Sequence, residues 1–297
     1  MSSAVVTGAS GFVGRRVLAR AGADAVSVSL GGRDWRERVA DARLGGACVY
    51  HLAARVHEAG ADEEQFTRDN VEKTIALAEA AARAGARRLV FLSTIKVNGE
   101  ETGDTPFRAD DPPAPQDAYA RSKRAAEDSL REFSVRSGLP IVIIRSPLVV
   151  GPGARGNLRA LLRLAASPLP LPFASLHNRR TLVGVDDLAA LLIACASAPS
   201  AAGKTFLAGD PQPVSTPQIL KAMRSAWGRP AALFRMSASA LESASGLILA
   251  SGKMRRLTRS LEADVSPAMR ELGWKPAESI EGAVAAMARA YRDKESR

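Results

Sequence analysis

The sequence predicts an α/β protein with a doubly wound parallel sheet and a smaller, mostly helical C-terminal lobe. Short apolar strands alternate with amphipathic helices over residues 1–150, which is the pattern of βαβ units. A glycine-rich turn joins the first of these strands to the first helix. Beyond residue 150 the alternation loosens and helical patterns dominate. We therefore expect a sheet domain in 1–150 and a lobe in 151–297, with the segment 181–198 packing back on the sheet.

Composition and charge limit the class of function. The chain has 297 residues, 46% of them hydrophobic and 5% aromatic, which suffices for a sizeable core. The formal net charge is +10, but the basic residues are scattered along helices and form no run dense enough to indicate nucleic acid or an anionic membrane. No apolar run reaches the ~18 residues of a membrane span, and the N-terminal residues lack a signal-peptide pattern. We expect a cytoplasmic protein that binds no nucleic acid.

The thiols and imidazoles indicate neither a disulfide nor a metal site. The two cysteines, Cys48 and Cys195, each lie in an apolar run, which predicts buried thiols. The three histidines, His51, His57 and His177, lack metal-ligand spacing. We therefore expect no metal.

A glycine turn after the first strand indicates a dinucleotide site. Residues 4–7 form a short apolar strand, and a helical pattern follows the turn through Ala21. Glycines let the backbone approach a ligand closely, and the helix N-terminus presents free N–H groups and a partial positive charge to a pyrophosphate. This context is typical of a Rossmann-type domain. The expected contacts are Gly8, Ser10, Gly11, Phe12, Val13 and Gly14.

The region that follows is short for such a domain. Residues 25–30 alternate like a strand, residues 35–42 form a short helix, and 48–52 is the next apolar strand. A βαβ unit takes roughly 30 residues, and a Rossmann half usually has two strands in this place. We infer that one β-α unit is missing or merged within 22–47.

The same region bears on the choice of cofactor. After the second strand an acidic residue usually holds the ribose 2′-hydroxyl of NAD, whereas a basic residue accepts the 2′-phosphate of NADP. The sequence offers Arg33 with Asp34 beside it, so NADP is favoured over NAD only slightly. If residues 25–30 correspond to the third strand, neither side chain lies at the selecting position.

Two segments after the shortened region supply further candidates. The apolar strand there ends in Leu52 and the small residues Ala53 and Ala54, which let the backbone approach a flat ligand, and all three are expected to contact the cofactor. A long helix over 62–84 carries Asn70, which is either a surface polar residue or a brace for the active-site strand.

A tyrosine and a lysine one helical turn apart are candidates for proton chemistry. Residues 118–138 predict a helix, and Tyr119 and Lys123 lie on one face of it. An ammonium beside a phenol favours the phenolate and brings a pKa near ~10 toward a useful range. Such pairs are common on ordinary helices, so this one gains its meaning from the rest of the chain.

Together these pieces resemble the extended short-chain dehydrogenases/reductases, in the nucleotide-sugar epimerase/dehydratase family. The matching stretches run in family order and cover nearly the whole chain except 22–47. They are TGASGFVG at 7–14, HLAA at 51–54, Ser93-Thr94, YARSK at 119–123, RSPLVVGPG at 145–153, RRTLVGVDDLA at 179–189 and LGWKP at 272–276. The set is specific, although no single member is.

The resemblance implies roles at the reacting centre. Tyr119 gives or takes the proton of a sugar hydroxyl, and Thr94 hydrogen-bonds the same oxygen. Lys123 holds the nicotinamide ribose and lowers the pKa of Tyr119. Ser93 and Pro147 join Tyr119 and Lys123 among the expected cofactor contacts.

It also implies substrate contacts. Besides Thr94, Lys96 would lie beside the sugar and Arg180 would hold the diphosphate, while Asn157 is a weaker candidate for the nucleotide. The alternatives are that Arg180 is a surface residue and that Asn157 is a helix N-cap.

The resemblance narrows the reaction without fixing it. Dehydratases of this family usually follow the threonine with two acidic residues, because elimination needs a carboxyl acid/base pair. Here Ile95 and Lys96 follow Thr94, which argues against a dehydratase. The stretch 93–100, STIKVNGE, with NRRTLV at 178–183, resembles the bacterial UDP-4-keto-6-deoxy-N-acetylhexosamine reductases of O-antigen and lipopolysaccharide assembly. We expect an NAD(P)-dependent 4-ketoreductase acting at C4 of a UDP-sugar, with a UDP-sugar 4-epimerase as the alternative.

Two other classes stay open. A reductase of a hydrophobic ketone, such as a steroid or flavonoid, is disfavoured by Arg180 and the basic charge, which suit a diphosphate. A non-catalytic dinucleotide sensor is disfavoured by the Tyr119–Lys123 pair and favoured by the shortened region 22–47. Dimers are common in the resembling family, often through the helix corresponding to 118–138, and we expect a homodimer.

Overall fold

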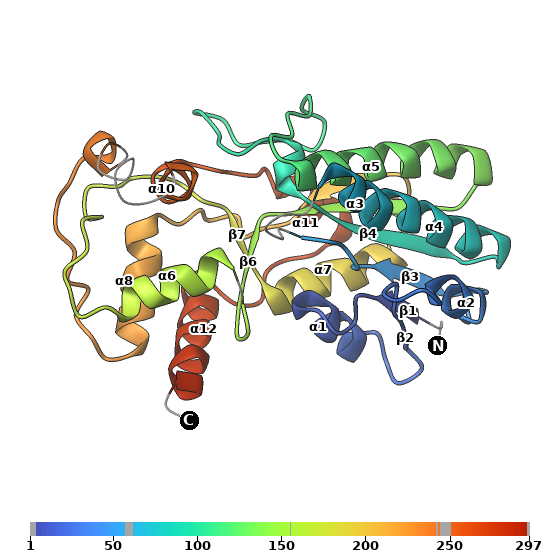
Figure 1. Ribbon diagram of the computed structural model, residues 1–297, viewed down its shortest axis with the longest axis horizontal. Coiled ribbons are helices and arrows are strands. Elements are labelled where there is room, and N and C mark those ends of the chain that lie inside the picture. The colour runs from blue at the N-terminus through green and yellow to red at the C-terminus, as the bar shows by residue number, and fades with distance from the viewer. Residues whose placement is uncertain (1–3, 57–61, 155, 242, 244–250, 296–297) are drawn as a thin grey trace.

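The computed structural model describes residues 4–56, 62–154, 156–241, 243 and 251–295. It has a larger part built on a sheet and a smaller helical part beside it (Figure 1). The sheet has six parallel strands in the order β2-β1-β3-β4-β5-β8, with helices on both faces. This confirms the doubly wound α/β fold. The strands are β1 Ala4–Thr7, β2 Val26–Val28, β3 Cys48–His51, β4 Arg88–Thr94, β5 Ile141–Ser146 and β8 Thr205–Leu207.

The strand order shows which unit is missing. β2 pairs directly with β1, with Val5 opposite Val26 and Thr7 opposite Val28. β3 pairs with the other side of β1. Within the part of the chain that the structure describes, no strand lies outside β2. β2 therefore occupies the second-strand position, and the absent strand is the third.

Two apolar layers hold the sheet between its helices. In β4, Leu89 and Phe91 point to one face and Val90 to the other, because side chains alternate along a strand. All three are fully buried, as expected for a central parallel strand. One face is covered by α2 (Trp35–Ala40), α4 (Lys73–Arg83) and α5 (Ala118–Ser137), and the other by α1 (Phe12–Arg20) and α7 (Val185–Ser197). Cys48 and Cys195 are buried free thiols in the second layer.

The helix expected over 62–84 contains a π-helical turn. α3 (Glu63–Thr67) begins where the Asp62 carboxylate accepts a hydrogen bond from the backbone N–H of Gln65. The π-helical segment η1 (Arg68–Glu72) follows and leads into α4. Such turns often occur at functional sites, and this one carries Asn70.

The smaller part has its own core. The two-stranded sheet of β6 and β7 leads into it, and apolar residues of α6, α8 and α12 pack together there. β8 and α7 lie beyond residue 150 but belong to the main sheet and its cover. No described helix is long and apolar enough to cross a membrane. The remaining elements are η2 Ile95–Val97, β6 Leu148–Val150, α6 Asn157–Ala166, β7 Leu182–Gly184, η3 Pro199–Ala201, α8 Thr216–Ala226, α10 Ser251–Thr258, α11 Ser266–Leu272 and α12 Ile280–Glu295.

Candidate active site

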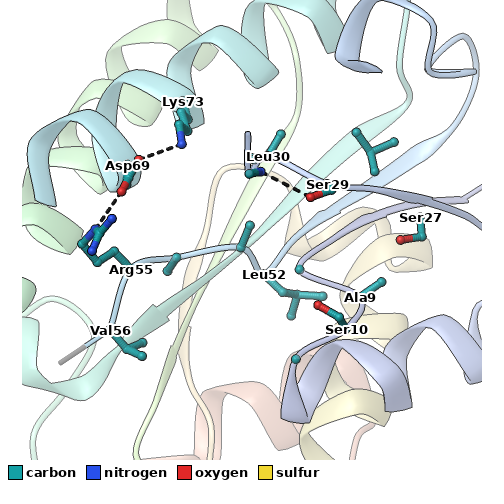
Figure 2. Close-up of a pocket in the computed structure, with 16 residues that line it drawn as sticks. Ala9, Ser10, Ser27, Ser29, Leu30, Leu52, Arg55, Val56, Asp69 and Lys73 are labelled. Carbon is teal, nitrogen blue, oxygen red and sulfur yellow. Dashed lines mark hydrogen bonds and ion pairs between the residues drawn. The ribbon is translucent and has the colours of Figure 1, made fainter. Parts of the chain in front are cut away.

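A cavity of about 900 Å³ lies at the carboxyl ends of β1, β2 and β3 (Figure 2). This edge is where doubly wound sheets bind their ligands. Six residues expected to contact the cofactor line it: Gly8, Ser10, Gly11, Leu52, Ala53 and Ala54. The rest of the lining is Ala9, Ser27, Val28, Ser29, Leu30, Gly31, Arg55, Val56, Asp69 and Lys73, which the sequence did not single out.

The glycine turn has no room for side chains. A Cβ on Gly14 would lie 2.0 Å from the carbonyl oxygen of Gly8. Gly8 itself has a φ of +70°, and a Cβ there would lie 2.6 Å from the backbone nitrogen of Ala53. Gly11 is the N-cap of α1, and no side chain caps this helix. The first-turn N–H groups are therefore available to an anion, so the turn fits a dinucleotide pyrophosphate.

The loop after β2 shapes the far end of the cavity. Ser29, Leu30 and Gly31 line it, whereas Arg33 is exposed and lies outside the lining. A contact between Arg33 and the cofactor stays a prediction. Its neighbour Asp34 pairs with Arg38, and this hydrogen bond lowers the pKa of the Asp34 carboxyl.

Three charged residues of the cavity lining interact with one another. Figure 2 shows Asp69 between Arg55 and Lys73, with Oδ2 2.7 Å from Arg55 Nε and Oδ1 2.7 Å from Lys73 Nζ. Burial alone would raise the pKa of Asp69, but the hydrogen bonds from Lys73 and Arg55 outweigh it and lower that pKa. The sequence signal for Asp69 and Lys73 was an i,i+4 pair, which is typical of any solvated helix face.

Asn70 is buried and not a surface residue, and it braces the loop after β3 and not the strand itself. Its side chain accepts from the backbone N–H of Arg55 at 2.7 Å and donates to the Ser122 hydroxyl at 2.9 Å. It is 1% exposed. Asn70 thus ties the loop after β3 to α5, between the two halves of the site.

α5 presents the tyrosine and the lysine. Asp117 caps the helix by accepting from the backbone N–H of Ala120 at 2.7 Å, which places Tyr119 in the first turn. Lys123 is 2% exposed, and its Nζ lies 3.8 Å from the centre of the Phe91 ring. Among the described residues, no hydrogen-bond acceptor or carboxylate pairs with this ammonium. Burial lowers the pKa of Lys123 to about 7.

The proton affinity of Tyr119 differs from the sequence expectation. Its pKa is raised, first by burial and then by the charge of Asp117. Lys123 was expected to lower this pKa, but the lysine is itself only partly charged at neutral pH because of its own burial. The phenol of Tyr119 is therefore protonated in the protein alone.

The two residues at the end of β4 face opposite ways. Thr94 is buried, and its hydroxyl accepts from the backbone N–H of Lys96 at 3.3 Å. The Ser93 hydroxyl points to α5 and donates to Glu127 Oε1 at 2.6 Å. The Ser93 side chain thus has a protein partner, and its contact with the cofactor stays a prediction.

Three other expected cofactor residues lie around the glycine turn and β5. The ring of Phe12 is next to Gly151, at the turn that follows β6. Val13 is half-buried against the core between α1 and the sheet. Pro147 is buried directly after β5.

Two of the expected substrate residues meet in one charged cluster. Lys96 Nζ lies 2.5 Å from Asp117 Oδ2 and 2.7 Å from Glu100 Oε1. Arg180 donates from Nη1 to the carbonyl oxygen of Arg256 at 2.8 Å, at the end of α10. Burial lowers the pKa of Arg180 to about 10, although the charge of Glu100 opposes this. Glu100 therefore connects Lys96 of the sheet domain to the lobe.

The third, Asn157, stands apart from this cluster. It is exposed at the first position of α6, and Gly156 takes the N-cap position instead. The alternative that Asn157 caps the helix is therefore wrong.

The model of the NAD dependent epimerase/dehydratase family matches residues 4–209. The chain belongs to this family. A UDP-glucose 4-epimerase from Vibrio cholerae is 34% identical over 255 residues, which cover 84% of this chain and 78% of that protein. A UDP-2-acetamido-2,6-beta-L-arabino-hexul-4-ose reductase from Pseudomonas aeruginosa is 30% identical over 196 residues, covering 62% and 46%. A structure of RMD from Pseudomonas aeruginosa complexed with NADPH has a TM-score of 0.79 at 20% identity, covering 99% and 100%, and shares the fold.

The family match and the shape of the glycine turn indicate the same class of protein. The chain is an enzyme of the extended short-chain dehydrogenase/reductase type, and its cofactor is a nicotinamide dinucleotide. The glycine turn, which a Cβ would fill, and the uncapped start of α1 suit such a cofactor.

Proposed function

We propose that the protein is an NADP-dependent 4-ketoreductase of a UDP-sugar. The observation that carries this choice is the stretch STIKVNGE at 93–100, in which Ile95 and Lys96 follow Thr94, together with NRRTLV at 178–183; both resemble the 4-keto-hexosamine reductases. The similarity to the UDP-2-acetamido-2,6-beta-L-arabino-hexul-4-ose reductase supports it. Reduction of a ketone needs a proton donor at the oxygen that becomes a hydroxyl, and the Tyr119 phenol in the first turn of α5 can supply that proton.

Each residue has a definite part in this reaction. The Tyr119 phenol gives its proton to the C4 oxygen, and the Thr94 hydroxyl hydrogen-bonds that oxygen. Lys123, whose ammonium lies against the Phe91 ring and has no hydrogen-bond or ion-pair partner among the described residues, would hold the ribose hydroxyls of the cofactor. When bound, the reduced cofactor supplies the hydride that C4 receives. The ketone thereby becomes an alcohol, with one hydrogen added to carbon and one to oxygen.

The charges around the cavity support NADP. The loop after β2 contributes Ser29, Leu30 and Gly31 but no carboxylate to the lining. Arg55 and Lys73 bring two basic side chains to the lining, and Asp69 pairs with both of them. Basic side chains beside the ribose favour a 2′-phosphate over a 2′-hydroxyl.

The charged cluster supports a nucleotide-sugar as the substrate. Arg256 lies 3.8 Å from Glu100, which in turn pairs with Lys96. Arg180 contacts the end of α10 through the carbonyl oxygen of Arg256. Three basic residues, Lys96, Arg180 and Arg256, therefore lie where the lobe meets the sheet domain. Such a place suits a diphosphate better than a steroid or flavonoid. The two enzymes named above act on UDP-sugars according to their names.

The test is incubation with UDP-4-keto-6-deoxy-N-acetylglucosamine and either NADPH or NADH. We expect oxidation of NADPH, followed by its absorbance, together with a reduced UDP-sugar identified by mass spectrometry. Tyr119→Phe should fold normally and lose this activity, and full activity in that variant would refute the role of Tyr119.

The second candidate is a UDP-sugar 4-epimerase, which the similarity to the Vibrio cholerae enzyme favours. Interconversion of UDP-glucose and UDP-galactose without net cofactor oxidation would identify it. In that case the Tyr119 phenol must lose its proton when the oxidised, cationic cofactor binds. Turnover of steroids or flavonoids, with none of UDP-sugars, would refute both candidates.

A further inference from the structure

A buried charged network lies one helical turn beyond Lys123. Glu127 is 0% exposed, and its carboxylate accepts five hydrogen bonds from three side chains, one of them from Arg145 Nε to Oε2 at 3.2 Å. Its Oε1 accepts from Ser93 Oγ at 2.6 Å and from Arg145 Nε at 3.0 Å. Its Oε2 accepts from Arg145 Nη2 at 2.7 Å and from Arg131 Nη2 at 2.9 Å. Both carboxylate oxygens are thus held in a single orientation.

Arg145 extends the network to a third element. It is 1% exposed on β5, and its Nη1 donates to the side-chain oxygen of Asn98 at 2.9 Å and to the carbonyl oxygen of Ala109 at 3.1 Å. The network therefore joins α5, β4, β5 and the loop after β4. Apolar residues of equal volume often stabilise a fold as well as a buried ion pair does. Stability alone thus gives no reason for charges at this place.

The position of the network relates it to the reacting residues. Ser93 directly precedes Thr94, and Glu127 follows Lys123 by four residues on the same helix face. The Ser93–Glu127 hydrogen bond therefore joins the strand end that carries Thr94 to the helix that carries Lys123 and Tyr119.

We propose that Glu127, held by Arg145, is a positioning residue that keeps Lys123 and Tyr119 in register with Thr94. Glu127 acts through the residues that it aligns, and the catalytic part of this inference rests on the proposed function. A displacement of about 1 Å between reacting groups is enough to cost a large part of the rate.

The charge of Glu127 gives a measurement that needs no substrate. The titratable groups near Lys123 are Tyr119 and Glu127 on α5, His51 on β3 and, behind Glu127, Arg145 on β5. His51 is uncharged, because burial first and Lys123 second lower its pKa to about 3. Glu127 raises the pKa of Lys123 against the effect of burial.

The first experiment follows the lysine side chains by carbon-13 NMR during a pH titration, with Lys123→Met identifying the signal. In Glu127→Gln the pKa of Lys123 should fall, because a negative charge is lost and Arg145 stays. Glu132→Gln is the control, since Glu132 is an exposed carboxylate on the same helix. An unchanged pKa of Lys123 in Glu127→Gln would overturn the inference.

The second experiment uses Ser93→Ala, which removes the connection to β4 and leaves every charge in place. We expect a hydride-transfer rate about tenfold lower, with the Kd for NADPH unchanged. A rate equal to that of wild type and Glu132→Gln would contradict positioning. If Glu127→Gln does not fold, Ser93→Ala decides the question. If wild type reduces no UDP-sugar, the proposed function fails, while the NMR titration still tests the position of Glu127 relative to Lys123.

Discussion

Replacing Lys123 with methionine should stabilise the protein near neutral pH and abolish hydride transfer. The lysine is 2% exposed, and burial lowers its pKa from 10.5 to about 7. Each pKa unit corresponds to about 1.4 kcal/mol. The shift therefore costs the folded state up to about 5 kcal/mol at and below pH 7. Methionine has a similar length and adapts its shape to a core, so it removes this cost without leaving a cavity.

The sign of the effect sets its pH dependence. Between pH 7 and 10.5 the unfolded chain binds a proton at Lys123 that the folded chain does not bind. The contribution of Lys123 to the free energy of unfolding therefore rises with pH across this window, by up to about 1.4 kcal/mol per pH unit. The advantage of Lys123→Met should be full near pH 7 and should shrink toward pH 10.5.

The assay is urea denaturation of wild type and Lys123→Met at pH 7, 8 and 9, with the difference in unfolding free energy taken at each pH. This difference removes the contributions of groups that the two proteins share. Lys221→Met serves as the control, because Lys221 is exposed on α8. A difference that does not vary with pH, or a variant less stable than wild type at pH 7, would refute the reasoning.

Three further outcomes follow from the same geometry. Gly14→Ala should abolish cofactor binding in a fluorescence titration, because its Cβ would lie 2.0 Å from the Gly8 carbonyl oxygen, whereas Gly103→Ala meets no atom within 4 Å and should bind normally. Lys73→Met should weaken NADPH by roughly tenfold and NADH little, since only NADPH carries the 2′-phosphate; equal losses for both would exclude this role. His51 is neutral with a pKa of about 3, so wild type should lose stability as the pH falls from 6.5 toward 3, and His51→Gln should remove part of that loss in urea denaturation.

Much of the site could be predicted because its signals are local. The glycine turn needs only a strand, a tight turn and a helix that follow one another. Three predicted cofactor residues of this turn and three after β3 line the cavity. Tyr119 and Lys123 share a helix face because of the helical period alone. The missing β-α unit was predictable from chain length. The place of Arg55 and Lys73 in the cavity could not be predicted from the sequence, because it depends on which strand ends these two residues lie beside.

The sequence by itself determined the fold class, the glycine turn and the Tyr119–Lys123 pair, since each depends on residues close together in the chain. Only the tertiary structure decided that β2 pairs with β1, that Arg33 is outside the cavity and that Ser93 faces Glu127. It also decided that burial raises the pKa of Tyr119 and lowers that of Lys123. From the proximity of the two residues alone, Lys123 was expected to lower the pKa of Tyr119. The physical reason is that strand pairing, burial and long-range charge depend on residues far apart in sequence, and no local pattern encodes how closely those residues pack.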